Sequence, residues 1–374
     1  MKGLLYITNL RLPTEKAYGI QIVKMCEAFA NQGVALELMM PSRQVVIRED
    51  IFSYYNIQKN FRTNKLRTPD FYLPGILDGI AVIIKEFISA VIIVFAVLAS
   101  KSENIYSRDE LPIFLLSFFR KNIIFEAHRY SQRRVWYYRR FRNSGIKVVA
   151  ISSGVHEKFM QMGFTSSQVL LAPDGVDVGQ FQDALSKKEC RDYLKLPHDK
   201  ILVTYAGQLY PWKGVDSLME AARSLDERFQ VVVVGGSKVD VARYSKKYAG
   251  CLNVSFIGWR PHRLVPMFLA ASDILILPNS SKEDISKIYT SPLKMFEYMV
   301  SERPIVASDL PSIREILTDE MAYFVSPDDA LSLAAGVVAA ATDVEGSLRR
   351  ASNARSAVTQ YSWDERARSI LRLF

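Results

Sequence analysis

Residues 201–214 read ILVTYAGQLYPWKG, an apolar run followed by a turn that carries glycine and lysine. The run Ile201–Tyr205 has the length and composition of a strand buried on both faces, and Gly207 follows it directly. Lys213 and Gly214 come just before a stretch with helical spacing. A glycine turn, a lysine and the amino end of a helix together suit a phosphate group. The stretch therefore predicts an α/β unit with an anion site at the carboxyl end of a strand.

Short β-rich runs alternate with helical stretches on both sides of this segment, which predicts parallel sheets with helices on both faces. The first series of expected strands is Leu4–Thr8, Leu36–Met40, Asn104–Tyr106, Ile123–Phe125, Lys147–Ile151 and Val169–Ala172. The second series is Ile201–Tyr205, Gln230–Val234, Val254–Ile257, Ile274–Leu277, Ile305–Ala307 and Tyr323–Val325. We therefore expect two doubly wound, Rossmann-like domains.

The break between the two series lies at Asp183–Lys200, a charged stretch with a proline that is predicted to be a linker. The expected domains are residues 1–185 and 196–358, facing each other across a cleft. Ligands of open α/β sheets bind at the carboxyl ends of the strands, so the cleft is the expected site.

Composition limits the classes of function. The chain has 374 residues, 49% hydrophobic and 23% charged, which is typical of a globular protein. Its three cysteines, Cys26, Cys190 and Cys251, are too far apart for a metal cluster or a disulfide framework, so a reducing compartment is expected. Met1–Tyr6 turns polar by Thr8, too soon for a signal peptide, and the chain is expected to be cytoplasmic.

Several chemistries lack their motifs in this sequence. There is no Asp-x-Asp, so a metal chelated by carboxylates is not expected, and no cofactor is predicted. The first expected strand is not followed by Gly-x-Gly-x-x-Gly, which disfavours a dinucleotide-dependent dehydrogenase. A Walker loop and a Gly-x-Ser-x-Gly elbow are also missing from the sequence.

The net charge of +9 is concentrated in the first half of the chain. Residues 1–190 contain 25 Lys and Arg against 17 Asp and Glu, whereas residues 191–374 contain 23 against 22. Arg129–Lys147 is basic and has no acidic residue. Such a stretch suits an anionic membrane surface or a phosphorylated substrate, and the alternative is a solvated basic helix. No nucleic-acid-binding motif accompanies it, so nucleic acid is not an expected partner.

An apolar segment, Ile76–Ala99, is also relevant to whether the chain contacts a membrane. Asp78, Lys85 and Glu86 interrupt it, and the uninterrupted part, Phe87–Ala99, is shorter than the about 20 residues that span a bilayer. We expect a helix buried against a sheet. The alternative is a helix whose outer face enters a membrane surface.

A second group of polar residues occurs at Ser291–Glu297, which reads SPLKMFE. Pro292 suits the first turn of a helix, where free N–H groups bind anions. Lys294 could hold a phosphate, and Glu297 could accept hydrogen bonds from a ribose diol. The alternative is a surface Lys–Glu pair with no role in binding.

Two further candidates lie in the first half of the chain. His128 follows the strand Ile123–Phe125, at the edge of the sheet where chemistry is expected, although a buried histidine with a structural partner is the alternative. The polar loop Asn9–Gly19 joins the first strand to the first helix, and loops of this kind often carry function. Gly19 would let a substrate approach the backbone.

These motifs together resemble family 4 glycosyltransferases with the GT-B fold. The segment Tyr289–Leu317 is similar to the donor-binding signature of that family. GQLYPWKGVDSLMEA, ISSGVHEKFMQMGF and APDGVDVGQF are similar to further segments of it, in the same order. The final residues, about 361–374, resemble the C-terminal helix that packs back onto the first domain.

The resemblance implies a retaining, metal-independent transfer of a sugar from a UDP- or GDP-sugar to a glycan or lipid-linked acceptor. The implied pathway is the synthesis of cell-surface polysaccharide or glycoconjugate, on the inner face of the cytoplasmic membrane. The implied catalytic residues are His128, Lys213 and Glu297. The implied donor-binding residues are Gly19, Gly207, Gln208, Lys213, Tyr289, Ser291, Pro292, Leu293, Lys294 and Glu297. The acceptor side is expected at Lys16, Tyr18 and Arg129.

The chain departs from the family pattern at two positions. The family often has a glutamate where this chain has Tyr289, and commonly an arginine where it has Gln208. One positive charge near the diphosphate is therefore missing, and Lys294 could supply it. These departures keep two alternatives open, a non-catalytic GT-B scaffold and a nucleotide-sugar epimerase of related fold.

Overall fold

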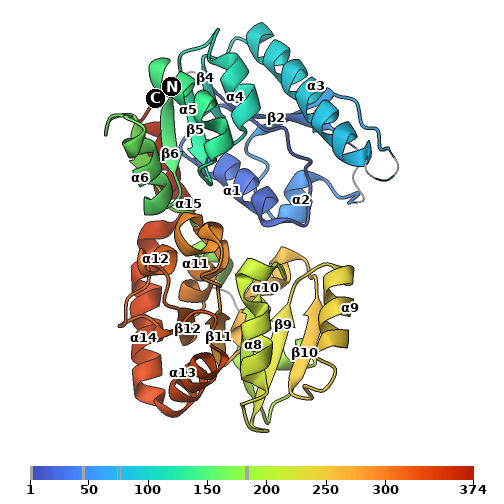
Figure 1. Cartoon of the computed structure of the whole chain (residues 1–374), viewed down its shortest axis with the longest axis vertical. Coiled ribbons are helices and arrows are strands. Elements are labelled where there is room, and N and C mark those ends of the chain that lie inside the picture. Colours follow the sequence, from blue (N-terminus) through green and yellow to red (C-terminus); the bar gives the residue numbers. More distant parts are fainter. Residues whose placement is uncertain (1–2, 44–46, 74, 76, 182–184) are drawn as a thin grey trace. The chain divides into compact units, whose positions relative to one another are not determined.

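The structure is a computed structural model that describes residues 3–43, 47–73, 75, 77–181 and 185–374 (Figure 1). It divides into two compact units. Unit 1 consists of Met1–Pro173 with Trp363–Phe374, and unit 2 consists of Asp174–Ser362. Each unit has a parallel sheet of its own and is described by itself.

The sheet of unit 1 has seven strands in the order β3-β2-β1-β4-β5-β6-β7. The strands are β1 (Leu4–Ile7), β2 (Leu36–Ser42), β3 (Arg62–Arg67), β4 (Asn104–Ser107), β5 (Ile123–Ala127), β6 (Lys147–Ala150) and β7 (Val169–Leu171). The helices are α1 (Ala17–Asn31), α2 (Ile51–Tyr55), α3 (Leu77–Ala99), α4 (Glu110–Leu116), α5 (Val135–Asn143), α6 (Ser153–Gln161) and α15 (Trp363–Leu371), with the 3-10 turn η1 (Gln132–Arg134).

The sheet of unit 2 has six strands in the order β10-β9-β8-β11-β12-β13. They are β8 (Ile201–Ala206), β9 (Phe229–Val234), β10 (Val254–Gly258), β11 (Ile274–Leu277), β12 (Ile305–Ser308) and β13 (Tyr323–Val325). The helices are α7 (Lys187–Leu194), α8 (Val215–Ala222), α9 (Lys238–Lys247), α10 (Val265–Ala271), α11 (Leu293–Val300), α12 (Pro311–Arg314), α13 (Ala330–Thr342) and α14 (Val344–Ala357). Short turns are η2 (Val178–Phe181), η3 (Pro211–Lys213), η4 (His262–Leu264), the π-helical η5 (Ile285–Tyr289) and η6 (Val358–Tyr361).

Continuous apolar strands explain why both faces of each sheet carry helices. Along β11, Leu275 and Leu277 join the core on one face, while Ile274 and Ile276 join the core on the other. The doubly wound α/β class is therefore confirmed for both units, and all the strands that the sequence predicts are present. That the two units face each other across a cleft stays a prediction.

One strand was not predicted from the sequence. β3 reads RTNKLR, forms an edge of the sheet and pairs with β2. Most of its side chains are exposed or half-buried, so it lacks the apolar run that marks the interior strands.

The expected linker is in part a helix of unit 2. Residues 182–184 lie outside the described residues, but α7 follows them and begins with a capping box formed by Ser186 and Glu189. Arg191 is buried and donates to the carbonyl oxygen of Ala271 at 2.9 Å and to Asp273 Oδ2 at 2.6 Å. These bonds attach α7 to unit 2, and the division between the units lies at Pro173 instead of near residue 185.

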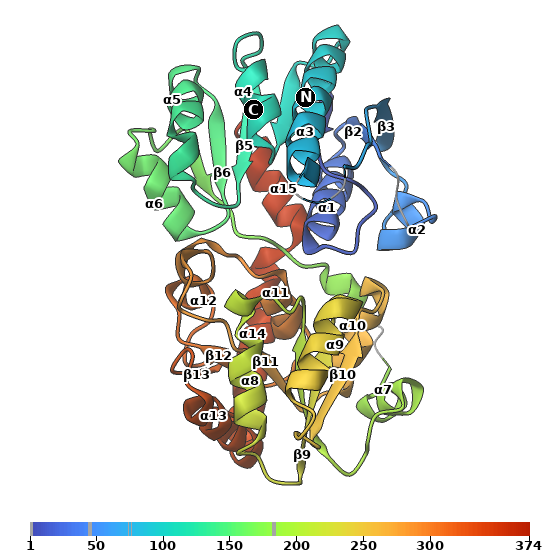
Figure 2. The ribbon, with the colours of Figure 1, turned by 45° about the vertical axis from the view of Figure 1, so that its right-hand side comes forward.

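The C-terminal helix α15 belongs to unit 1, although the chain reaches it from unit 2. It lies against α1, as Figure 2 shows, and buries Ala367 and Ile370. Asn31 Nδ2, at the end of α1, donates to Asp364 Oδ1 at 3.2 Å. The helix therefore completes the core of unit 1.

The apolar segment predicted at 76–99 forms the helix α3, and Ile76 lies outside the described residues. One face, with Ala90, Ile93 and Val97, is buried. This confirms the predicted burial of the helix for that face only. The other face exposes large apolar side chains, among them Ile83 and Phe87 at 68% and 52%. In the described part of the chain α3 is the one helix whose length and composition would by themselves allow it to cross a membrane, and α13 with α14 meets that criterion only as a bent pair.

Candidate functional site

The turn after β8 is built around close backbone contacts in unit 2. Gly207 N donates to the carbonyl oxygen of Val234 at 2.8 Å, and Gly214 has a φ of +70°. A Cβ on Gly214 would lie 1.7 Å from the carbonyl oxygen of Pro278, so only glycine fits. The turn is therefore held directly against the carboxyl end of β11, and it carries Lys213 there.

Lys213 is half-buried and lies over the Trp212 ring, with Nζ 3.8 Å from the ring centroid. Loss of water around the ammonium group lowers the pKa of Lys213 to about 7. The second lysine, Lys294, is buried in the first turn of α11, with Nζ 4.0 Å from the centroid of Tyr205. Burial and the nearby Lys213 hold the pKa of Lys294 well below its usual range.

The two lysines lack a negative partner among the residues that the structure describes. Lys294 Nζ has no hydrogen-bond partner there, and no carboxylate contributes to the lowered pKa of either lysine. The interpretation of Lys294 and Glu297 as a surface ion pair is therefore wrong. The positive charges of a half-buried and a buried lysine at one edge of a sheet disfavour each other, and a bound anion with more than one charge would stabilise both.

Glu297 pairs with a histidine that the sequence analysis did not single out. His262 Nε2 lies 2.6 Å from Glu297 Oε1, and both side chains are partly exposed. His262 belongs to η4, just after β10, so the rule that singled out His128, a histidine beyond the carboxyl end of a strand, would also have found it.

Two further polar side chains in the connection from β11 to α11 have no partner within the described chain. Asn279 is fully buried, and neither its amide nitrogen nor its amide oxygen is hydrogen-bonded. Ser286, in η5, is also fully buried with a free hydroxyl. Buried polar groups are normally paired, so groups left open beside a candidate anion site indicate a ligand. Asn279 could have been recognised from the sequence as a candidate, because it comes just after the expected strand Ile274–Leu277.

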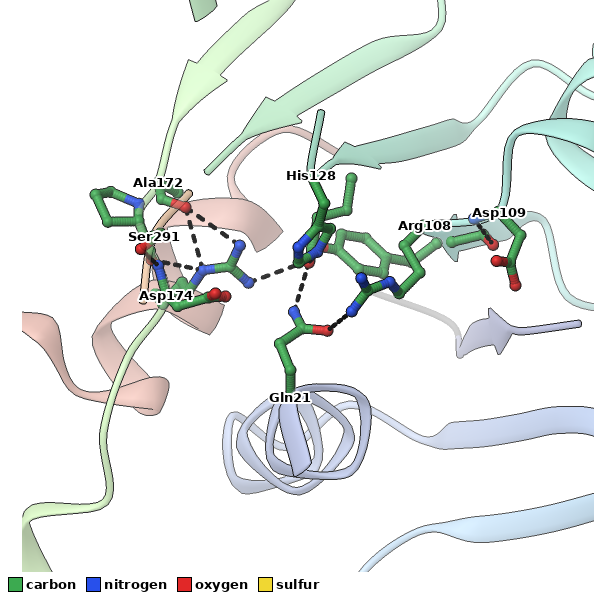
Figure 3. Close-up of polar contacts among 12 residues, drawn as sticks. Gln21, Arg108, Asp109, His128, Ala172, Asp174 and Ser291 are labelled. Atoms are coloured by element: carbon green, nitrogen blue, oxygen red, sulfur yellow. Dashed lines mark hydrogen bonds and ion pairs between the residues drawn. The ribbon is translucent and has the colours of Figure 1, made fainter. Parts of the chain in front are cut away.

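The remaining donor-side candidates of unit 2 lie around these residues. Ser291 is buried and its Oγ accepts a hydrogen bond from Asp174 N at 3.0 Å (Figure 3). Pro292 and Leu293 form the beginning of α11, so their backbone is placed as the resemblance implies. Gln208 accepts a hydrogen bond from Tyr205 Oη at 2.6 Å through its carbonyl oxygen, and Tyr289 ends η5.

His128 in unit 1 takes part in a buried network around Glu126, the residue two positions before it. Glu126 Oε1 accepts a hydrogen bond from Gln21 Nε2 and lies within hydrogen-bond distance of His128 Nε2. Burial and the guanidinium of Arg108 lower the pKa of His128 to about 4, so the ring is neutral at pH 7. Figure 3 shows Gln21 pointing from α1 toward His128, with Arg108 beside them.

The loop before α1 is fixed by a tyrosine. Tyr55 Oη accepts from Thr14 N at 2.8 Å and donates to the carbonyl oxygen of Thr14 at 2.9 Å. A Cβ on Gly19 would lie 2.1 Å from the same hydroxyl, so packing against Tyr55 by itself requires a glycine there. The acceptor-side candidates Lys16 and Arg129 are exposed, and Tyr18 is half-buried.

Metal ligands are grouped nowhere in the described ranges: no three His, Cys, Asp or Glu side chains come together in a way that could hold an ion. At the carboxyl ends of β8 and β11, the structure brings together the positive side chains of Lys213 and Lys294.

Comparison with known proteins adds the following. Residues 200–343 match the family model described as Glycosyl transferases group 1. The chain is 26% identical over 209 residues to the putative teichuronic acid biosynthesis glycosyltransferase TuaC of Bacillus subtilis, covering 56% of this chain and 50% of that one. It is 27% identical over 225 residues to a phosphatidyl-myo-inositol mannosyltransferase of Mycobacterium tuberculosis, covering 57% and 56%. The matched region thus spans about half the length of these relatives.

A solved structure extends the likeness to the whole chain. The structure of HepE from Anabaena in complex with UDP and glucose matches with a TM-score of 0.76 and 16% identity, covering 100% of this chain and 99% of that one. This likeness shows that the chain has the GT-B fold. The family model, which matches residues 200–343, and the similar relatives support a group 1 glycosyltransferase of family 4.

Proposed function

We propose that the protein is a retaining glycosyltransferase that moves a sugar from a UDP- or GDP-sugar to a glycan or lipid-linked acceptor, in the synthesis of cell-surface polysaccharide or glycoconjugate. The observation that carries this proposal is the pair Lys213 and Lys294, a half-buried and a buried lysine that have no carboxylate partner within the described residues. A nucleoside diphosphate supplies the negative charges that this pair lacks.

The positive charges of the two lysines would assist the transfer of the sugar as well as the binding of the donor. Breaking the bond between sugar and phosphate leaves positive charge on the anomeric carbon and additional negative charge on the diphosphate. Lys213, Lys294 and the free N–H groups at the start of α11 would stabilise that leaving group. Lys294 would supply the positive charge that Gln208 does not.

The other site residues take roles that agree with their surroundings. Glu297 has one oxygen held by His262, which leaves the other for a hydroxyl of the ribose. His128 is neutral at pH 7, so it would orient the sugar and accept or donate hydrogen bonds, without acting as a cation. The acceptor would attack from the side on which the diphosphate departs and pass its proton to it, which retains the configuration.

The names of the similar proteins support the classes of donor and acceptor. The HepE complex contains UDP and glucose. One relative is named for teichuronic acid, a polysaccharide, and another for phosphatidyl-myo-inositol, a lipid. No metal is needed in the proposed mechanism, because the two lysines supply the positive charge.

We further propose that unit 1 binds an anionic membrane from the cytoplasmic side. Helix α3 packs next to α4, and α4 packs next to α5 (Figure 1). Phe118 and Trp136 are more than half exposed, and both rings contact Phe114, at 5.4 and 4.7 Å between centroids. Arg133 and Arg139 are exposed beside them. Apolar side chains flanked by arginines suit an interface with anionic lipid.

Not all of the basic stretch is available for lipid. Arg134 forms an ion pair with Glu110 of α4, so an acidic residue outside the stretch compensates it. Arg140 donates to the carbonyl oxygen of Ser117 at 2.9 Å and lies over the Phe118 ring.

Direct assay of the function uses a panel of UDP- and GDP-sugars, with release of the nucleotide measured with and without glycan and lipid acceptors. Acceptor-dependent release that survives EDTA is expected. Binding of nucleotide sugars without any release would instead favour the scaffold, and loss of activity in EDTA that manganese or magnesium restores would contradict metal independence.

Lys213→Ala should reduce kcat/KM for the donor by at least about 30-fold, about 2 kcal/mol of transition-state stabilisation, because the leaving group loses a charge aimed at it. The matched control is Lys246→Ala, an exposed lysine of α9 in the same unit, which should leave kcat/KM unchanged. Near-normal turnover of Lys213→Ala would show that Lys213 does not stabilise the diphosphate leaving group.

Binding of UDP should take up protons at pH 8. The pKa of free Lys213 is about 7, and a bound diphosphate raises it, so the group gains a proton between the two pKa values. Calorimetry in two buffers of different ionisation enthalpy measures the uptake, which should fall in Lys213→Ala. Equal proton uptake by the native protein and by Lys213→Ala would mean that a group other than Lys213 takes up the proton.

Lys294→Met should make the free protein more stable and its complex weaker. A buried ammonium group without a partner costs free energy, and methionine packs on Tyr205 without that cost. We expect a higher Tm without ligand and a Kd for UDP raised at least about tenfold. A higher Tm with unchanged affinity for UDP would mean that Lys294 does not touch the ligand.

The whole protein should bind anionic liposomes through unit 1 and should not bind neutral ones, and 1 M salt, where the Debye length is about 3 Å, should release most of it. Arg133→Glu with Arg139→Glu should weaken binding, whereas Lys238→Glu with Lys246→Glu on α9 changes the charge equally and should not. Salt-independent binding would favour the apolar face of α3 as the anchor. No binding to either liposome would contradict the membrane proposal.

A further inference from the structure

Glu126 is a fully buried carboxylate on which four hydrogen-bond donors converge. Oε1 accepts from Gln21 and His128, and Oε2 accepts from Tyr106 and from Arg366, the latter at 3.2 Å. Burial alone would raise the pKa of Glu126, but Arg366 and His128 hold it below its usual range, so the group is a carboxylate. An ionised carboxylate can only accept hydrogen bonds.

The direction of each bond in this network follows from that charge. Arg108 donates to Gln21 Oε1 at 2.9 Å, so the amide nitrogen of Gln21 faces Glu126 and donates to it. His128 must likewise carry its hydrogen on Nε2, because Glu126 cannot supply one. In a neutral ring this leaves Nδ1 without hydrogen, as an acceptor.

Arg366 comes from the C-terminal helix, 240 positions from Glu126 in the sequence. Its side chain is buried, and it also donates to the carbonyl oxygens of Ala172 and Pro173, at 3.2 and 2.8 Å. Figure 3 shows these bonds beside the labelled Ala172. The guanidinium therefore has a fixed place, and α15 supplies the opposite charge that Glu126 needs within the sheet of unit 1.

We propose that Glu126, neutralised by Arg366 of the C-terminal helix, is a positioning residue that holds His128 in the tautomer whose Nδ1 accepts a hydrogen bond from a hydroxyl of the transferred sugar. This rests on the proposed function for the role of His128, and it goes beyond it by assigning the atom that meets the sugar and the two residues that prepare it. A carboxylate behind a histidine fixes both the tautomer and the ring orientation.

A purely structural role for the same residues makes a different prediction. If the Glu126–Arg366 pair only stabilised unit 1, a variant that still folds would keep the kinetics of the native protein. A positioning role changes kcat while the lysines of unit 2 still bind the donor, so KM for the donor stays the same.

The tautomer is measured without any substrate. Long-range proton–nitrogen NMR on protein labelled with 15N-histidine distinguishes hydrogen on Nε2 from hydrogen on Nδ1. The chain has four histidines, and His128→Gln identifies the signal. Native protein at pH 7.5 is expected to carry the hydrogen of His128 on Nε2. Hydrogen on Nδ1 would overturn the proposal whatever the variants do.

Kinetics of variants test the consequence. Glu126→Gln keeps the shape of the side chain and removes its charge, so His128 should show a mixture of tautomers and kcat should fall at least about tenfold with KM for the donor within about twofold. Arg366→Met should act in the same direction, and Arg366→Lys should recover part of the loss. Arg368→Met, an exposed residue of the same helix, is the matched control and should change nothing.

The outcomes separate the two proposals. If the native protein transfers sugar and folded Glu126→Gln keeps both kcat and the Nε2 tautomer, the positioning role is wrong and the proposed function stands. If no donor is turned over by the native protein, the proposed function fails, and the NMR result still decides the tautomer. Should Glu126→Gln not fold, the tautomer in the native protein and the kinetics of Arg366→Lys remain decisive.

Discussion

The loss of water around two neighbouring lysines that have no negative partner is the constraint on which the interpretation of unit 2 depends. Lys213 and Lys294 share the edge of the sheet where β8 and β11 end, and the described chain offers neither a carboxylate. This arrangement destabilises the protein as long as the anion is absent. Such destabilising groups occur in proteins where a bound ligand compensates for them. The glycine turn around Gly214 and the stacking on Tyr205 hold the charges together in spite of that destabilisation.

In unit 1, by contrast, the buried charge of Glu126 is compensated by other residues of the protein. Glu126 has its full set of donors before any ligand arrives, and His128 is neutral because burial and Arg108 disfavour its charged form. In the proposed function, the lysines of unit 2 would stabilise the charge that develops on the leaving group. His128 of unit 1 would offer a hydrogen-bonding atom that does not reorganise during the reaction.

The sequence predicted the fold well because apolar runs such as Val231–Val234 can only be interior strands. It failed at β3, whose polar residues fit an edge, and at α7, where a buried arginine and a capping box replace an apolar face. In the site, Gly207 and Lys213 could be recognised because they lie in one short turn, six positions apart in the chain.

Other site features depend on contacts that no local pattern records. The partner of Glu297 is His262, which lies 35 positions away, and that of Glu126 is Arg366, 240 positions away. Asn279 is informative only because the structure leaves its buried amide without a partner among the described residues. Local sequence thus indicated candidate binding residues, and the structure added how these side chains are held.

The place of α15 has a consequence for how the protein is made. A ribosome produces the strands of unit 1 first, then the whole of unit 2, and only afterwards the helix that covers α1. Until then the nascent unit 1 has an uncovered apolar surface and a Glu126 without Arg366, whereas unit 2 has everything it needs to fold. Unit 1 can therefore complete its core only after the whole of unit 2 has been synthesised, although its strands are made first.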